Sequence, residues 1–180
     1  MRFRLSGWVL MLEQFQLLTR PELAETSPTI IEAMAAAKLA HPGIIPAYDV
    51  VLDGEFTGIV TGYIRGTTLA QILTQEAVPN LEISLRYLHE TAVALNHAHR
   101  KGVIHRDIKP ANITIDQYST VKIMDFGIAK VAASAALTQT GFVLGTPEYM
   151  SPEQISGQKV DGRSDQFSLG VIAPSLLKSD

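Results

Sequence analysis

The chain has 180 residues, of which 46% are apolar and 18% are charged, and this composition predicts a globular domain rather than a disordered segment. The formal net charge of −3 gives no electrostatic reason to expect nucleic acid or an anionic membrane as a partner. The absence of cysteine excludes disulfides and thiolate metal sites, and it fits a cytoplasmic location. The apolar run at residues 8–12 is too short to cross a bilayer, so we expect no membrane segment in this chain.

The first third of the chain is predicted to be rich in strands. Residues 3–18 are apolar with few breakers, which predicts one or two strands. Residues 29–40 contain good helix formers and predict a helix that ends before Pro42. Two further strands are predicted at residues 44–52 and 56–64, with a turn between them.

From Thr68 onward the spacing of apolar residues changes to that of helices. Long helices are predicted at residues 81–100 and 164–172, and the first carries one apolar stripe: Leu85, Leu88, Ala92 and Leu95. The predicted connections between them are short strands at 103–104, 113–115 and 121–124 and a long loop at 127–150. A strand-rich part followed by a helical part indicates an α+β fold.

Three short polar motifs follow one another in the second half of the chain. The first runs from His105 through Arg106 and Asp107 to Asn112, so that an aspartate and an asparagine stand five residues apart. The other two are Asp125-Phe126-Gly127 and Ser151-Pro152-Glu153. Each motif alone occurs often by chance, whereas the ordered set, with strands before the first two, indicates a single functional site.

These motifs resemble the catalytic loop, the metal-binding triplet and the Ala-Pro-Glu motif of protein kinases, with the bacterial serine/threonine branch closest. The resemblance covers roughly residues 29–172. It implies a two-lobed fold, with a partial N-lobe at residues 1–64 and a partial C-lobe at residues 65–180. It also implies transfer of the ATP γ-phosphate to a serine or threonine hydroxyl of a protein substrate, with ATP and Mg²⁺ as cofactors.

The resemblance gives each motif residue an expected role. Asp107 would orient the acceptor hydroxyl, and Lys109 would place positive charge near the transferring phosphoryl group. Asn112 and Asp125 would supply oxygen ligands to Mg²⁺, and Lys109 and Asn112 would also contact ATP. The residues expected to receive adenine are Thr61, Tyr63 and Ile64. The residues expected to support the site are Glu32, His105, Arg106, Phe126, Gly127, Thr146, Glu153 and Asp165.

Two further interpretations remain open alongside these roles. Thr138 and Thr140 are candidate phosphorylation sites, because a phosphate there could pair with Arg106 and order the loop. The alternative is that they are ordinary exposed threonines. The histidines at positions 97, 99 and 105 could suggest a metal site, but no cysteine or carboxylate cluster completes it, so structural roles are favoured.

Two parts of the kinase pattern are missing near the N-terminus. The strand lysine is expected near residues 16–17, but the first lysine in the sequence is Lys38. A glycine-rich loop is missing too, because Gly7 is the only glycine before Gly43. Glu32 would then lack its partner cation, which weakens electrostatic support of the transition state. The alternative function is therefore a catalytically inactive, pseudokinase-type binding or scaffold protein, or a gene fragment.

The C-terminal part also departs from the kinase pattern. Pro174 is predicted to end the last helix, because a proline removes a backbone hydrogen bond. Without the helices that follow in the family, Leu169 and Ile172 would be partly bare, and Glu153 would lack its arginine partner. We therefore expect a kinase domain truncated at both ends, with self-association through exposed apolar surface of the C-lobe.

Overall fold

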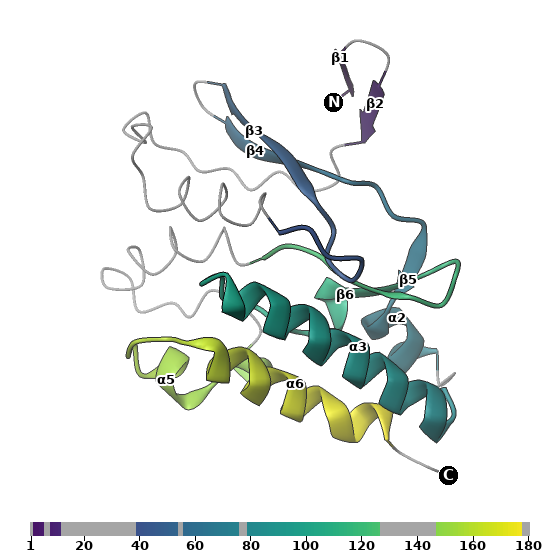
Figure 1. Ribbon diagram of the computed structural model, residues 1–180, viewed down its shortest axis with the longest axis vertical. Coiled ribbons are helices and arrows are strands. Elements are labelled where there is room, and N and C mark those ends of the chain that lie inside the picture. The colour runs from purple at the N-terminus through teal and green to yellow at the C-terminus, as the bar shows by residue number, and fades with distance from the viewer. Residues whose placement is uncertain are drawn as a thin grey trace.

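The computed structural model describes residues 2–5, 8–11, 39–53, 56–75, 79–126 and 147–177. Its strands are β1 (Arg2–Leu5), β2 (Trp8–Met11), β3 (Ala47–Asp53), β4 (Phe56–Thr61), β5 (Gly66–Thr68), β6 (Ile113–Asp116) and β7 (Val121–Ile123). Its α-helices are α2 (Leu69–Thr74), α3 (Leu81–Arg100), α5 (Pro152–Ile155) and α6 (Gly162–Leu176), and short 3₁₀ turns are η1 (Pro110–Asn112) and η2 (Pro147–Tyr149). Figure 1 shows the helices grouped below the strands. The predicted α+β class is confirmed.

The strands form three small antiparallel sheets. Pairs β1–β2 and β3–β4 are two-stranded, and the third sheet has the order β5–β6–β7. Gly66 opens β5 opposite Asp116, where an added β-carbon would lie only 2.4 Å from the carbonyl oxygen of Ile115. Only glycine therefore allows this backbone approach. The predicted strand at residues 103–104 is wrong, because Val103 and Ile104 form an extended connection outside any sheet.

Helix α3 has the bounds that the sequence predicts, but a different buried face. The Asn80 side chain caps its start by accepting from the amide of Ile83 at 3.0 Å, and Gly102 follows its end with φ at 76°. The buried residues are Ser84, Tyr87, Thr91, Ala94, Leu95 and Ala98. Leu85 is 50% exposed and Ala92 is exposed, so the predicted stripe is wrong in part. Small and hydroxyl side chains form the contact face because α6 and β7 pack closely there.

Helix α6 continues through Pro174 to Leu176, so the predicted stop at residue 172 is wrong. Ile172 and Leu176 are buried at 0% and 1% exposure, where α6 packs against α3 (Figure 1). Burying two large aliphatic side chains stabilises the helix by more than the one hydrogen bond that the proline removes. The same packing corrects the expected exposure of Ile172, while Leu169 is half-buried against the core.

The hydrophobic core lies between the three-stranded sheet and the pair of helices α3 and α6. Its sheet residues include Ile113, Ile115, Val121 and Ile123. Ile44, before β3, joins this core through a parallel bridge to Ile123. Most of the helix predicted at 29–40 lies outside the described residues, and Leu39 and Ala40 are not helical. No helix within the described ranges combines the length and apolar character needed to cross a membrane.

Candidate functional site

The loop between α3 and β6 brings three predicted catalytic residues together. The ammonium of Lys109 lies 2.9 Å from Asp107 Oδ2. The side-chain amide of Asn112 donates to the backbone oxygen of Asp107 at 2.7 Å and to its Oδ2 at 3.2 Å. Asn112 is buried in the η1 turn, and its backbone amide donates to the carbonyl of Lys109 at 2.9 Å. The Asp107 carboxylate therefore lies between a cation and an amide, both from the same loop.

Asp125 reaches the same place from the end of β7. Antiparallel pairing of Ile113 with Ile123 puts the residues before β6 and after β7 at one end of the sheet. The amide of Met124 donates to the backbone oxygen of Asn112 at 2.9 Å, which joins the two segments. Crowding by the surrounding chain, and then the negative charge of Asp107, raise the pKa of Asp125, although part of the residue stays open to solvent. Asp125 and Asp107 are thus close enough to interact.

His105 lies beneath this site and is fully buried. Its Nδ1 accepts from the amide of Asp107 at 3.2 Å, so the ring proton is on Nε2, which donates to the carbonyl of Met124 at 2.7 Å. Burial lowers the pKa of His105 despite the nearby Asp165 charge, and the imidazole is neutral. The ring of Phe126 packs on it at 4.7 Å between centroids. His105 therefore joins the backbone at Asp107 to the backbone at Met124, next to Asp125.

Asp165 of α6 holds the backbone of the loop from below. Its carboxylate accepts from the amides of His105 at 2.9 Å and Arg106 at 2.8 Å. It also lies 2.7 Å from His99 Nε2, which must carry a proton to donate to a carboxylate. Arg106 has a φ of 66°, a left-handed conformation that costs energy for any residue except glycine. The buried carboxylate fixes that conformation from an element 59 residues further along the chain.

Gln154 contacts this loop as well, although the sequence did not single it out. Its side-chain amide donates to the carbonyl of Arg106 at 2.8 Å. Its Oε1 accepts from the amide of Ser151 at 3.1 Å, which forms the capping box of α5. The pattern Ser-x-x-Gln was a readable signal for that cap. Nothing local indicated the bond to Arg106, 48 residues away, or the bond from His99 to Asp165.

Glu153 lies next to Gln154 and contacts α6. The hydroxyl of Ser164 donates to its Oε1, and this bond lowers the pKa of Glu153. Glu153 thus has a hydrogen-bond partner among the described residues, Ser164 of α6. Ser164 is fully buried at the start of α6, so the contact ties the Ser-Pro-Glu segment to the helix that carries Asp165.

The residues expected to receive adenine lie at the end of β4. Thr61 is exposed, Tyr63 is 65% exposed and Ile64 is half-buried. The amide of Gly62 donates to the carbonyl of Pro46 at 3.0 Å, which holds this segment against the start of β3. The other predicted site residues lie outside the described part of the chain: Glu32, Gly127, Thr138, Thr140 and Thr146.

Comparisons with known proteins identify the family. The family model for the protein kinase domain matches residues 18–180. The chain belongs to the protein kinase family. Among curated kinases, it is 42% identical over 154 residues to serine/threonine-protein kinase PknB of Mycobacterium leprae, covering 83% of this chain and 25% of that protein. It is 41% identical over 167 residues to serine/threonine-protein kinases drp72 of Corynebacterium efficiens, covering 88% and 32%.

A probable serine/threonine-protein kinase of Clostridium acetobutylicum is 40% identical over 141 residues, which cover 78% of this chain and 22% of that protein. The chain thus spans about a quarter to a third of the curated kinases that it matches. Protein kinases in general use ATP and a divalent metal ion. Because this chain belongs to the family, it has a protein kinase fold, which combines helices and sheets.

Asn112 and Asp125 together offer oxygen atoms that fit a divalent metal ion. Asn112 uses its amide nitrogen for Asp107, and its Oδ1 accepts no hydrogen bond from the described residues. Together with the Asp125 carboxylate, this leaves hard oxygen atoms of the kind that Mg²⁺ prefers. No group of three histidine, cysteine, aspartate or glutamate residues gathers within the described ranges. The nitrogen atoms of His99 and His105 described above contact protein groups, which disfavours the histidine metal site.

Proposed function

We propose that this kinase-family protein transfers the γ-phosphate of ATP to a serine or threonine hydroxyl of a protein substrate. One observation carries the proposal: the Asp107 carboxylate is held by Lys109 and Asn112 at 2.9 and 3.2 Å, beside Asp125. Phosphoryl transfer depends on positioning and charge neutralisation, and this group of side chains offers both.

Each side chain of the group has a distinct proposed part. Asp107 accepts the hydrogen bond of the substrate hydroxyl and orients it for in-line attack. Lys109, which the ion pair keeps next to Asp107, places its ammonium near the phosphoryl group. Asn112 Oδ1 and the Asp125 carboxylate hold Mg²⁺, and Lys109 and Asn112 also contact ATP. The cation, when bound, neutralises charge on the phosphates. The segment containing Thr61, Tyr63 and Ile64 receives adenine.

The proposed arrangement of the chain follows the two lobes of the family. Residues 1–64 form part of the N-lobe, with Glu32 and the adenine segment, and residues 65–180 form part of the C-lobe. Gly127 and Thr146 support the site, and Thr138 and Thr140 are sites of phosphorylation that order the loop through Arg106. The chain also self-associates in this proposal, through exposed apolar side chains of the C-lobe. Exposed apolar residues there include Leu81, Leu85 and Phe167. Sedimentation analysis tests this. A cytoplasmic location completes this proposal.

The test is Mg²⁺-dependent transfer of labelled phosphate from ATP to a generic protein substrate. Asp107→Asn keeps the shape of the side chain and removes its charge, so transfer should fall by about 10²-fold or more. Asp161→Asn is the matched control, because Asp161 caps α6 and asparagine is an equally good cap. Transfer that Asp107→Asn leaves unchanged would contradict the proposal.

A second candidate function is a pseudokinase-type binding or scaffold protein. One observation favours it: no lysine precedes Lys38, although the family places its phosphate-binding lysine about 15 residues before the helix glutamate, here Glu32. The same assay separates the two candidates. ATP binding without transfer, equal in wild type and Asp107→Asn, supports the scaffold function.

A further inference from the structure

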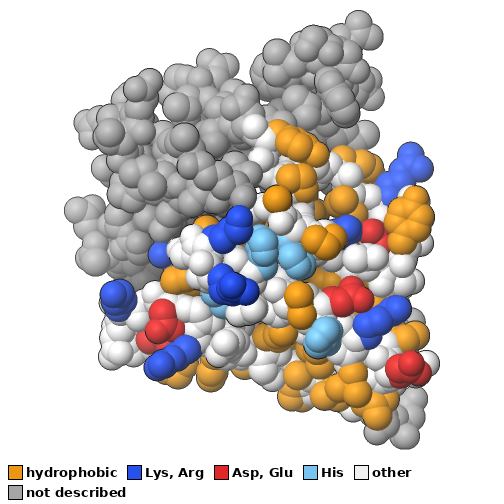
Figure 2. Space-filling model, viewed as in Figure 1, with side chains coloured by type: hydrophobic (Ala, Val, Ile, Leu, Met, Phe, Trp, Pro, Cys, Tyr) orange, Lys and Arg blue, Asp and Glu red, His pale blue; other side chains and the backbone are white. Residues whose placement is uncertain are grey.

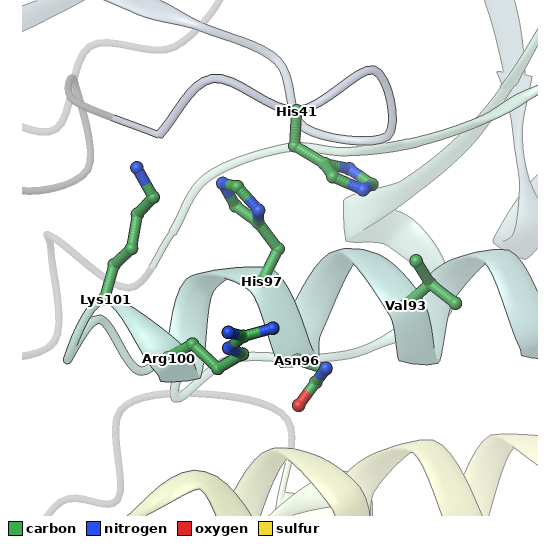
Figure 3. A pocket seen from close by; sticks show the side chains of 6 residues that line it. All are labelled: His41, Val93, Asn96, His97, Arg100 and Lys101. Carbon is green, nitrogen blue, oxygen red and sulfur yellow. The ribbon is translucent and has the colours of Figure 1, made fainter.

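A second site lies outside the group around Asp107, next to the C-terminal end of α3. The structure has a hollow of about 470 Å³ there. Its lining residues are His41, Val93, Asn96, His97, Arg100 and Lys101 (Figure 3). Four of these six side chains are basic, and none is acidic. Figure 2 shows histidine and basic side chains gathered on this face of the molecule.

The hollow joins two segments that are far apart in the sequence. Figure 3 shows His97 rising from α3 toward His41, which comes from the loop before β3. The two imidazole rings have centroids 4.9 Å apart and are tilted by 39°. Lys101 stands on the other side of His97, and Arg100 lies along the near side of α3. The fold thus assembles this set of basic side chains around one space.

These charges have no counter-ion among the described residues. Neither Arg100 nor Lys101 forms an ion pair there, and both are exposed. Basic side chains at the end of a helix often neutralise its last carbonyl groups. Here the carbonyl of Ala98 already accepts from the amides of Lys101 and Val103, at 2.9 and 3.0 Å. Interaction with the last carbonyl groups of α3 therefore does not account for all the basic side chains around the hollow.

The two histidines of the hollow add hydrogen-bonding groups to these cations. Burial, followed by the charges of His97 and Lys122, lowers the pKa of His41. His41 Nδ1 accepts from the amide of Gly43 at 3.0 Å, so its Nε2 carries the proton and is a donor. His97 Nε2 is buried and has no hydrogen-bond partner. A buried nitrogen without a partner is costly, and the donor on His41 Nε2 suits an acceptor with negative charge.

From this geometry we propose that the hollow binds an oxyanion of the phosphate class. Hydrogen-bond donors and cations surround it, and an oxyanion is the ligand that accepts from all of them at once. A transition-metal ion fits less well, because His41 and His97 have no third ligand of the usual kind among the described residues. The ligand is either free phosphate or the phosphate of a phosphorylated side chain. This proposal is independent of the transfer activity.

The experiment follows the imidazole signals of His41 and His97 by NMR in the full chain at constant ionic strength. The three additions are inorganic phosphate, a phosphothreonine peptide and sodium chloride. We expect saturable shifts of both signals with the two phosphate ligands and a higher pKa for His41 in the bound state. Tighter binding of the peptide identifies a phosphorylated side chain as the source. Tighter binding of inorganic phosphate identifies the free ion.

The variant Arg100→Gln/Lys101→Gln removes two exposed cations and should weaken phosphate binding by about tenfold or more, because two charge-assisted contacts with the ligand are lost. The matched control is Lys159→Gln/Arg163→Gln, which removes two exposed cations elsewhere. Equal shifts in chloride, no saturation, or equal weakening in both variants overturn the proposal. Circular dichroism before titration shows that each variant is folded.

Discussion

The catalytic loop and the segment proposed to receive adenine are held in different ways. The loop at residues 105–112 is fixed from below by the buried Asp165 carboxylate and from the side by Gln154. The segment at residues 61–66 has exposed side chains at Thr61 and Tyr63, and strand pairing holds it. The comparison shows that, of these two regions, the loop that carries Asp107 has the larger share of specific polar side-chain contacts.

The reason for this difference lies in the backbone of the loop. Arg106 and Asp125 both have positive φ, at 66° and 53°. Such conformations cost on the order of 1–3 kcal/mol each and persist only where the surroundings enforce them. Bonds from the Asp165 carboxylate to two amides supply this enforcement for Arg106. The adenine segment has no such conformation among its described residues and needs no comparable support.

The largest expected effect comes from Asp165→Ala. It leaves the amides of His105 and Arg106 buried without their acceptor, so the free energy of unfolding should fall by about 3 kcal/mol. Tyr63→Ala, in the contrasting segment, should change it by no more than about 0.5 kcal/mol, because Tyr63 is 65% exposed. Urea unfolding followed by circular dichroism measures both. Equal losses in the two variants would remove the contrast between the regions.

A smaller effect is expected from Gln154→Leu, which removes the bond to the Arg106 carbonyl. Because that peptide leads directly into Asp107, kcat for transfer should fall about tenfold with little change in KM. Hydrogen exchange at residues 105–107 should also become faster, which is measurable without any activity. The exposed Gln166 provides the control Gln166→Leu. Unchanged exchange in Gln154→Leu would show that the bond does not hold the loop.

The sequence predicted the site residues better than the contacts that hold them. Asp107 and Asn112 belong to one short motif, whereas the antiparallel pairing of β6 with β7 that places Asp125 beside them was not predicted from the sequence. The contacts of Gln154 with Arg106 and of His99 with Asp165 were not predicted, because they join residues 48 and 66 positions apart. Such bonds leave no periodic pattern in the sequence, since they depend on how α5 and α6 pack beneath the loop.

The fold was predicted least well where packing overrides local preference. Pro174 lies inside α6 because Ile172 and Leu176 are buried against α3. Leu85 was placed on the buried stripe of α3, but the closest contacts use Ser84, Thr91 and other smaller side chains instead. Helical spacing shows which residues share a face, but it does not show which face a neighbouring helix covers.

A further prediction concerns the pH dependence of the loop region. The folded state keeps His105 neutral, so its pKa lies below the unfolded value of about 6.5. Between these two values the unfolded chain binds more protons, and stability is lost as the pH falls below about 6.5. His105→Gln should reduce this slope in thermal unfolding between pH 7 and pH 5. His41 acts in the same direction, so His41→Gln is measured beside it, with exposed His89→Gln as control.

The smallest expected effect is a slight stabilisation by Asp125→Asn. Because the folded pKa of Asp125 is raised, the folded state binds more protons than the unfolded state as the pH rises from the ordinary value toward the raised one. Stability is lost over that window, so the ionised carboxylate of Asp125 destabilises the folded state at pH 7. Asp125→Asn should therefore raise Tm slightly at pH 7 but not at pH 3, while it weakens divalent metal binding. A lower Tm at pH 7 would contradict this sign.

The most direct test of the account is where a divalent cation binds. With an ATP analogue present, Mn²⁺ replaces Mg²⁺ and broadens the NMR signals of nearby residues. We predict the strongest broadening at Asn112 and Asp125, with Asp107 next, and little at the exposed Glu82 in the first turn of α3, a helix about 30 Å long. Broadening centred elsewhere, or equal along the whole chain, would contradict a metal site formed by these residues.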